Sequence, residues 1–189
     1  MMVAAASATV NHNGAMSYDD EHHRERLEAY DRRIAELQRR GTFGAAVMLT
    51  ALEEAERGAI EGEVPVGALV LRDNRVIGAG HNEPIAMRDA TAHAEIVAIR
   101  EACAYLGEYR LEDAALYVTL EPCVMCVGAI IQARIAKVYY GARDDKAGAL
   151  GSVYDIGRDG RLNHSVEVYG GIMAAESASL LREFFRSRR

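Results

Sequence analysis

Two short stretches, 92-AHAEIVAI-99 and 121-EPCVMCVGAI-130, constrain the fold more than any other part of the sequence. Each is an apolar run that predicts a buried helix. Each also begins with side chains that bind metal ions, His93 in the first and Cys123 and Cys126 in the second. Residues i and i+3 of a helix point to nearly the same side, so both cysteines can reach one ion. If His93 reaches that ion too, the fold must bring the starts of two buried helices together.

The cysteine pair is ambiguous when it is considered alone. A single C-x-x-C fits a redox dithiol, half of a zinc ribbon or two core cysteines about equally well. The start of a helix favours the thiolate form that binds zinc, because unpaired backbone N–H groups and the helix dipole stabilise negative charge there. With His93 as a third ligand, a tetrahedral zinc would keep one open position, which is typical of a catalytic site that activates water.

Glu95 follows His93 by two positions, which places the two side chains about 200° apart around a helix. They cannot easily bind the same ion. We therefore expect Glu95 beside the metal, where its carboxylate would take a proton from the activated water and pass it on.

Composition limits the class of protein. The chain has 189 residues, of which 50% are hydrophobic and 26% charged, as in a single soluble globular domain. The net charge of −6 gives no overall attraction for nucleic acid, so an RNA site would need a local basic patch. Three cysteines without a secretory signal favour a cytoplasmic location, and no apolar run is long enough to predict a membrane span.

The pattern of apolar residues divides the chain near residue 40. Residues 1–40 form a predicted N-terminal extension, with a disordered start to about residue 18 and then a charged amphipathic helix. Residues 41–189 form the predicted catalytic domain. Its patterns predict helices over 45–59, 92–106, 123–134 and 173–189, and strands over 64–73, 75–82, 115–121, 137–142 and 166–171.

This order of elements predicts the fold class. Two adjacent strands joined by Asp73 and Asn74 indicate a β-hairpin, and strands alternate with helices after it. Such alternation is typical of an α/β protein, here a three-layer α/β/α sandwich with a mixed five-stranded sheet between helices.

The motifs H-x-E at 93–95 and P-C-x-x-C at 122–126 resemble the signature of the zinc-dependent nucleoside and nucleobase deaminases. In finer detail the chain resembles the bacterial tRNA-specific adenosine deaminases over residues 45–189. The stretches that carry this resemblance are 63-EVPVGA-68, 75-RVIG-78, Asn82, 91-TAHAE-95, 109-YRL-111, 117-YVTLEPCVMC-126, 141-GARD-144, 151-GS-152, 163-NH-164 and 184-FF-185.

The resemblance implies a role for each residue of the motifs. His93, Cys123 and Cys126 would hold one Zn²⁺ per subunit, and Glu95 would be the proton shuttle. Asn82 would form a hydrogen bond with the purine nucleoside in the pocket; alternatively, it is only a turn residue after a strand.

The resemblance also implies RNA contacts and a homodimer whose partner subunit completes the RNA site. Asp144 and Lys146 would lie near the nucleotides that flank the target, although a glycine-rich loop of this kind is usually only a connection. The C-terminal segment 182-REFFRSRR-189 mixes four arginines with two aromatics, which can bind phosphate and stack bases, so Phe185 and Arg186 are RNA-binding candidates. Alternatively, the segment is a solvated helix end.

Three residues depart from the pattern or stand outside it. Ala90 replaces a proline that often precedes the threonine, and His81 stands where an aromatic or another side chain is expected. Cys103 has no role in the motif and is predicted to be a core residue.

Three functions remain open on the sequence. The first is hydrolytic deamination of adenosine to inosine at the wobble position of a tRNA anticodon stem-loop, with no DNA substrate and no membrane partner. The second keeps the chemistry but uses a free base or nucleoside, such as guanine, cytosine or cytidine. The third is a non-catalytic module in which Cys103 or His164 supplies a fourth zinc ligand.

Overall fold

A mixed five-stranded sheet forms the centre of the molecule, in the order β4-β3-β5-β6-β7. β3 is antiparallel to both β4 and β5, while β5, β6 and β7 run parallel. The structure is a computed structural model that describes residues 9–10, 16–17 and 20–188. The strands are β3 (Gly67–Arg72), β4 (Arg75–His81), β5 (Ala115–Leu120), β6 (Lys137–Ala142) and β7 (Glu167–Gly170), which confirms the predicted sheet.

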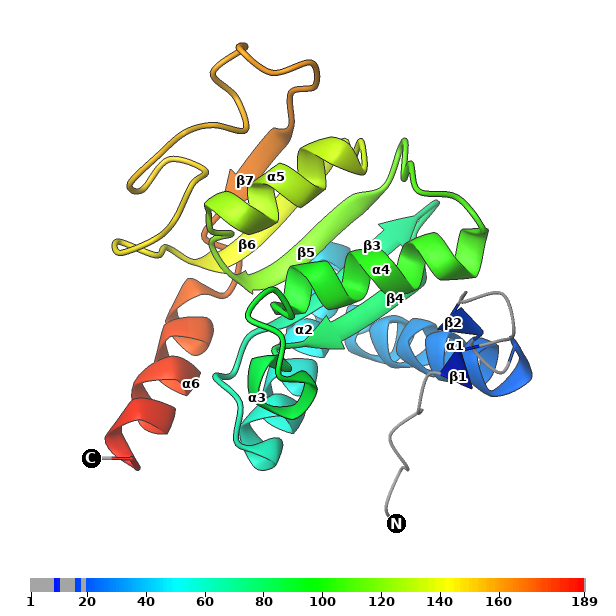
Figure 1. Ribbon diagram of the computed structural model, residues 1–189. Coiled ribbons are helices and arrows are strands. Elements are labelled where there is room, and N and C mark those ends of the chain that lie inside the picture. The colour runs from blue at the N-terminus through cyan, green and yellow to red at the C-terminus, as the bar shows by residue number, and fades with distance from the viewer. Residues whose placement is uncertain (1–8, 11–15, 18–19, 189) are drawn as a thin grey trace.

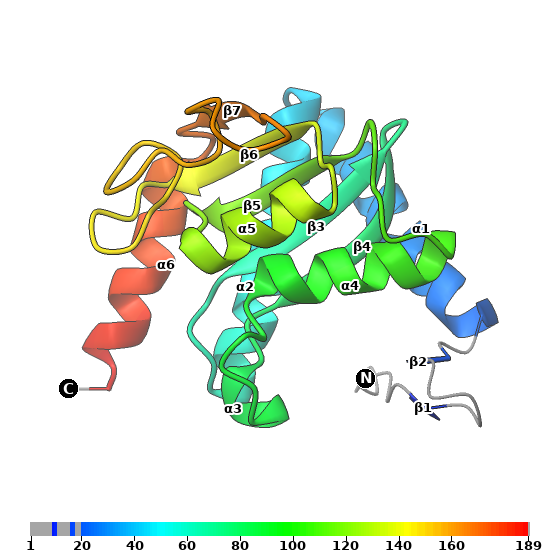
Figure 2. The same ribbon diagram turned by 45° about the horizontal axis from the view of Figure 1, so that its top comes forward.

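Helices cover both faces of the sheet (Figure 1). On one face α4 (Ala94–Leu106) and α5 (Val124–Gln132) close a core with residues of β3 and β5. On the other face lie α2 (Phe43–Glu61) and α6 (Ala174–Arg186), as the turned view also shows (Figure 2). The predicted three-layer α/β/α sandwich is confirmed. None of the helices that the structure describes is both long and apolar enough to cross a membrane.

The β3–β4 hairpin shows how the sequence sets the local geometry. Asp73 and Asn74 both have positive φ, 52° and 61°, as the two central residues of a type I′ turn require. Further along β4, a Cβ atom at Gly78 would collide with the Ala98 carbonyl of α4. The glycine therefore lets α4 lie directly on the sheet, and this contact fixes where the start of α4 lies.

The helix α1 (Asp20–Gln38) is the amphipathic helix that the sequence predicts. Leu27, Tyr30 and Ile34 are 2%, 4% and 3% exposed and share a core with α2. The predicted disorder of the first residues concerns a stretch that lies mostly outside the described residues. Within it the structure places only two short paired strands, β1 (Thr9–Val10) and β2 (Met16–Ser17).

α1 also supplies partners to two buried carboxylates. Tyr30 donates a hydrogen bond of 2.6 Å to Glu54 of α2, which is 2% exposed. Arg26 forms an ion pair with Glu101 of α4, which is 3% exposed, and the His23 Nδ1 lies 3.3 Å from the same carboxylate. The extension is therefore packed into the same structure as α2 and α4, and the predicted division at residue 40 falls between two helices that share a core.

One short helix was not predicted. The helix α3 (Pro84–Met87) follows β4 and is held by Glu63, whose Oε1 accepts hydrogen bonds of 2.9 Å from the Ile85 and Ala86 N–H groups. A helix of this length has no apolar period to read, and its partner lies more than 20 residues away.

Candidate active site

The three predicted metal ligands lie together at the starts of α4 and α5. His93 is the residue before α4, and Cys123 is the residue before α5, each with an extended backbone. The His93 Nδ1 atom is 3.7 Å from the Cys123 sulfur and 3.6 Å from the Cys126 sulfur, and the two sulfurs are 3.6 Å apart. Zinc bonds of about 2.0–2.3 Å in a tetrahedron place ligand atoms about 3.5–3.8 Å apart, so the cluster fits this ion.

The cluster is also chemically suited to a cation. The Cys126 thiol and the His93 ring hydrogen-bond the Cys123 sulfur and lower the pKa of Cys123 to about 3. The hydrogen bond with Cys123 and burial raise the pKa of Cys126. The hydrogen bond with Cys123 raises the pKa of His93. Cys123 is thus a thiolate in contact with Cys126 and His93. A bound metal cation would replace the protons that these side chains hold.

Glu95 lies in the first turn of α4 and is 4% exposed. It is not part of the ligand cluster, but its carboxylate lies within hydrogen-bonding reach of the Cys126 thiol. Burial raises the pKa of Glu95 to about 7. A carboxyl group of this pKa beside the ligands can both accept and donate a proton near neutral pH.

Asn82 lies just after β4 and fastens the start of α4. Its Oδ1 accepts a hydrogen bond of 2.9 Å from the Ala94 N–H, and its Nδ2 donates one of 3.1 Å to the Val64 carbonyl. The side chain therefore has a structural role next to His93. The amide carries a second N–H beside the one that binds Val64.

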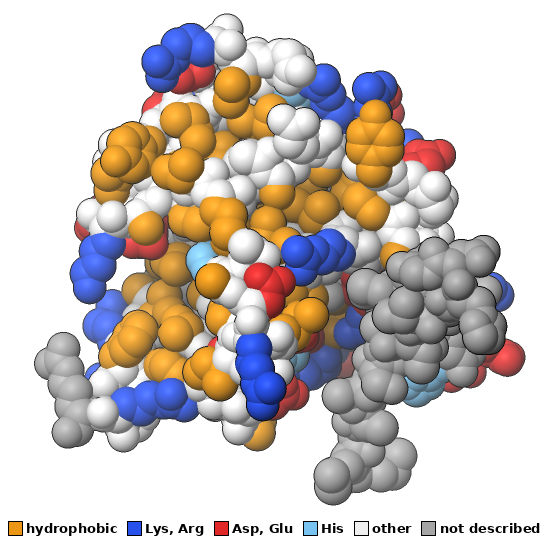
Figure 3. All heavy atoms as spheres, viewed as in Figure 1, with side chains coloured by type: hydrophobic (Ala, Val, Ile, Leu, Met, Phe, Trp, Pro, Cys, Tyr) orange, Lys and Arg blue, Asp and Glu red, His pale blue; other side chains and the backbone are white. Residues whose placement is uncertain are grey.

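Three of the predicted RNA-binding residues, Lys146, Phe185 and Arg186, line one groove at the edge of the molecule. A groove of about 640 Å³ lies between α6 and the loop after β6, and Figure 3 shows cationic side chains over α6 at the lower left. Asp144 does not line this groove; its Oδ1 accepts hydrogen bonds from the Lys146 and Ala147 N–H groups. The groove is lined by Lys146, Leu181, Arg182, Phe185, Arg186 and Arg188.

No fourth protein ligand joins the cluster among the residues that the structure describes. Cys103 packs partly buried against the core with its sulfur 3.7 Å from the Tyr109 carbonyl, and the His164 ring lies 2.7 Å from the Ile135 carbonyl. Both candidates for a fourth ligand are thus engaged elsewhere, which argues against the structural-zinc hypothesis.

Glu121 has no signal in the sequence; it is 2% exposed and accepts four hydrogen bonds from the loop after β6. The partners of His81 were not predicted either. The His81 Nδ1 is 3.1 Å from Glu54, and its Nε2 is 3.3 Å from Glu61 and 3.9 Å from Glu83. Glu54 and Glu61 lie 27 and 20 residues before His81, and contacts at such separations leave no periodic signal.

The His81 contacts predict a pH-dependent stability. Burial alone would lower the pKa of His81, but the hydrogen bond and charge of Glu54 outweigh it and raise the pKa above its ordinary value. A raised pKa in the folded state means that the stabilisation is complete below about pH 6.5 and is lost as pH rises through the folded pKa. Glu61 and Glu83 face the same ring and act in the same direction.

We therefore expect His81→Gln to lower the free energy of unfolding by about 2 kcal/mol at about pH 6 and by less at about pH 9. Urea unfolding at both pH values measures this difference. His22→Gln, a change at an exposed histidine of α1, is the matched control. An equal loss for His81→Gln at both pH values would contradict the assigned charge.

Three side chains that could hold one metal ion, with a buried carboxylate beside them at helix starts of an α/β/α sandwich, are typical of a metal-dependent enzyme. Residues 43–142 match the family model for the zinc-binding region of cytidine and deoxycytidylate deaminases. A tRNA-specific adenosine deaminase of Streptococcus pyogenes serotype M1 is 47% identical over 142 residues, covering 75% of this chain and 83% of that protein. The chain therefore belongs to the cytidine and deoxycytidylate deaminase family.

Solved structures confirm the fold and name two kinds of substrate. A structure from a study of A-to-I editing by tRNA:A34 deaminases superposes with a TM-score of 0.68 and is 47% identical, covering 69% of this chain and 95% of that one. A guanine deaminase from Nitrosomonas europaea superposes with a TM-score of 0.63 at 28% identity, covering 74% of this chain and 83% of that one.

Proposed function

We propose that this chain is a zinc-dependent hydrolase that converts adenosine 34 of tRNA to inosine. The observation that carries the proposal is the basic groove with an exposed Phe185, which a chain of net charge −6 needs for RNA and a small-molecule deaminase does not. The proposal is supported by relatives named tRNA-specific adenosine deaminases.

The reaction replaces the amino group at C6 of adenine with oxygen from water and releases ammonia. His93, Cys123 and Cys126 would hold one Zn²⁺, which makes a bound water acidic enough to react at neutral pH. Glu95 would carry one proton from the attacking water to N1 of the ring, and then a second proton from the new C6 hydroxyl to the departing amino group. Burial keeps the Glu95 carboxyl away from bulk water, so the proton passes to the substrate.

Recognition of the RNA would divide between the pocket and the groove. The free N–H of Asn82 would bind the purine, while the cations of the groove contact phosphates and Phe185 stacks on a flanking base. An anticodon loop is already single-stranded, so turning one base into the pocket costs less than it does in a duplex.

A deamination assay of the zinc-loaded protein tests the proposal. The substrates are an anticodon stem-loop with A at the wobble position, the same stem-loop with a deoxyadenosine there, and free guanine, adenosine and cytidine. We expect inosine in the RNA stem-loop and no ammonia from the free compounds. Ammonia from guanine alone would instead favour the second candidate, which the similarity to the guanine deaminase supports.

The zinc ligands give a separate prediction. Cys126→Ser should reduce bound zinc from about one per chain to near zero, because a serine hydroxyl is a far poorer zinc ligand than a thiolate. Metal analysis of the purified protein measures it, with Cys103→Ser as the matched control that keeps its zinc. A full zinc content in Cys126→Ser would remove this cysteine from the ligand set.

The proposal includes a homodimer in a reducing cytoplasm, where the thiol ligands stay free of disulfides. Its support is an apolar surface around α5, where Val124, Val153 and Tyr154 are 48%, 45% and 56% exposed. Figure 3 shows hydrophobic side chains over α5 and the loops beside it. Light scattering after size-exclusion chromatography tests the dimer. A native chain that is monomeric, with a mass that Val124→Asp does not change, would exclude the dimer.

A further inference from the structure

Glu121 is a buried carboxylate that neither the ligand cluster nor the groove includes. It lies between the end of β5 and Pro122, directly before the cysteine pair. Its Oε1 accepts hydrogen bonds of 3.0 Å from the Leu150 and Ser152 N–H groups. Its Oε2 accepts a hydrogen bond of 3.2 Å from the Asp144 N–H and another from the Ser152 hydroxyl.

These partners lie at the two ends of one loop, residues 143–152, which follows β6. One carboxylate therefore closes the loop from both sides. Asp144, which Glu121 holds, in turn accepts hydrogen bonds of 2.9 Å and 3.2 Å from the Lys146 and Ala147 N–H groups. This chain of contacts runs from the buried carboxylate to the exposed lysine that lines the groove.

The loop is also packed against the start of α5. The Ala149 N–H donates a hydrogen bond of 2.9 Å to the Pro122 carbonyl, and Gly148 pairs with Cys123. A Cβ atom at Gly148 would lie 2.6 Å from the Glu121 carboxyl carbon, so the backbone passes directly over this group. The loop and the segment that carries the cysteines thus form one unit around Glu121.

We propose that Glu121 is a positioning residue for RNA binding, which fixes the 143–152 loop so that Lys146 faces the groove. The proposal rests on the proposed function, since it concerns the RNA substrate. Glu121 touches neither RNA nor metal in this role; it acts through Asp144 and Lys146.

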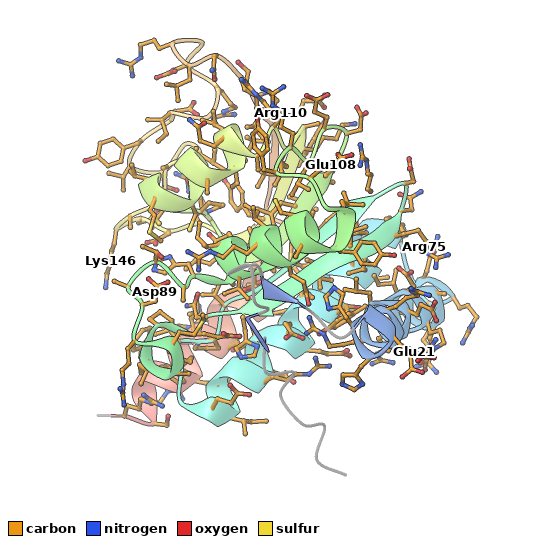
Figure 4. The ribbon with its side chains drawn as sticks, turned by 45° about the vertical axis from the view of Figure 1, so that its right-hand side comes forward. Glu21, Arg75, Asp89, Glu108, Arg110 and Lys146 are labelled. Carbon is orange, nitrogen blue, oxygen red and sulfur yellow. The ribbon has the colours of Figure 1, made fainter. Side chains whose placement is uncertain are left out.

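The first experiment measures the loop without RNA. Glu121→Gln keeps the volume but turns one acceptor into a donor that faces backbone N–H groups. We expect hydrogen exchange at the Leu150 and Ser152 amides to accelerate by roughly tenfold or more, with zinc content unchanged. Glu108→Gln, the same change at an exposed carboxylate far from Lys146 (Figure 4), should change neither amide. Unchanged exchange in Glu121→Gln would overturn the proposal.

The second experiment separates positioning from a general loss of structure. Glu121→Gln should raise KM for the stem-loop by roughly tenfold and change kcat by less than about twofold. Lys146→Ala should raise KM by a similar factor in the native chain, but add less than about twofold in the Glu121→Gln background. Lys137→Ala, at the chain's other lysine, is the control for loss of charge. If the factors by which Glu121→Gln and Lys146→Ala raise KM multiply in the double variant, the proposed coupling between the two residues is wrong.

The hydrogen-exchange and kinetic experiments separate failure of the proposed function from failure of the role of Glu121. If the native chain does not deaminate the stem-loop, the proposed function fails, while hydrogen exchange still decides whether Glu121 holds the loop. If the native chain is active but Glu121→Gln leaves KM unchanged, only the positioning role fails.

Discussion

Replacing Glu95 with alanine is expected to lower kcat for the stem-loop by about 10²–10⁴-fold, because a positioned general acid–base contributes roughly this factor. The bound zinc and the fold should remain, since Glu95 is outside the ligand cluster. Single-turnover assays and metal analysis on the same preparation measure both quantities.

Two further variants make this result specific. Glu95→Gln keeps the shape of the side chain and should be as inactive as Glu95→Ala, because an amide cannot carry the proton. Glu108→Ala removes an exposed carboxylate beyond the other end of α4 and should keep full activity. Normal turnover in either Glu95 variant would refute the proton-shuttle role.

Deleting residues 1–40 is expected to lower the free energy of unfolding by more than about 5 kcal/mol. Removing Leu27, Tyr30 and Ile34 forfeits about 1.5–3 kcal/mol for each buried side chain. The deletion also strips Glu54 and Glu101 of their α1 partners, and breaking a buried pair by removing one partner costs about 3–5 kcal/mol. Since native domains are stable by about 5–15 kcal/mol, much of the truncated chain should be unfolded. Denaturant unfolding followed by circular dichroism measures this loss.

A single substitution isolates the electrostatic part of this effect. Arg26→Met leaves Glu101 with one charged partner fewer and should destabilise the protein by several kcal/mol. Arg24→Met, at an exposed arginine of the same helix, should change stability by less than about 0.5 kcal/mol. A truncated protein as stable as the full chain would show that α1 is dispensable.

The sequence predicted those parts of the molecule that local chemistry sets. The β3–β4 turn at Asp73 and Asn74 and the starts of α4 and α5 follow from turn residues, period and helix-start chemistry. The sequence also predicted the cluster of His93, Cys123 and Cys126, because binding one metal ion requires fixed distances between the ligand atoms.

Contacts between segments that are distant in the chain could not be predicted. The Leu150 amide, Tyr30 and Arg26 meet Glu121, Glu54 and Glu101 only after folding, because each of these partners lies more than 20 residues from its glutamate in the chain. The groove could be predicted only in part. Lys146 and Phe185 were each suggested by composition and resemblance, but only the packing of α6 beside the loop places them together.

The position of α1 beside β4 also determines which edge of the sheet can recruit another chain. Asp31 accepts a hydrogen bond of 2.9 Å from the Val76 N–H and pairs with Arg75, so a helix side chain occupies the edge of β4. An edge strand with unpaired backbone groups is a template for strand addition and aggregation. Without α1, β4 would offer such a template, so loss of this helix would favour irreversible association through the sheet as well as unfolding.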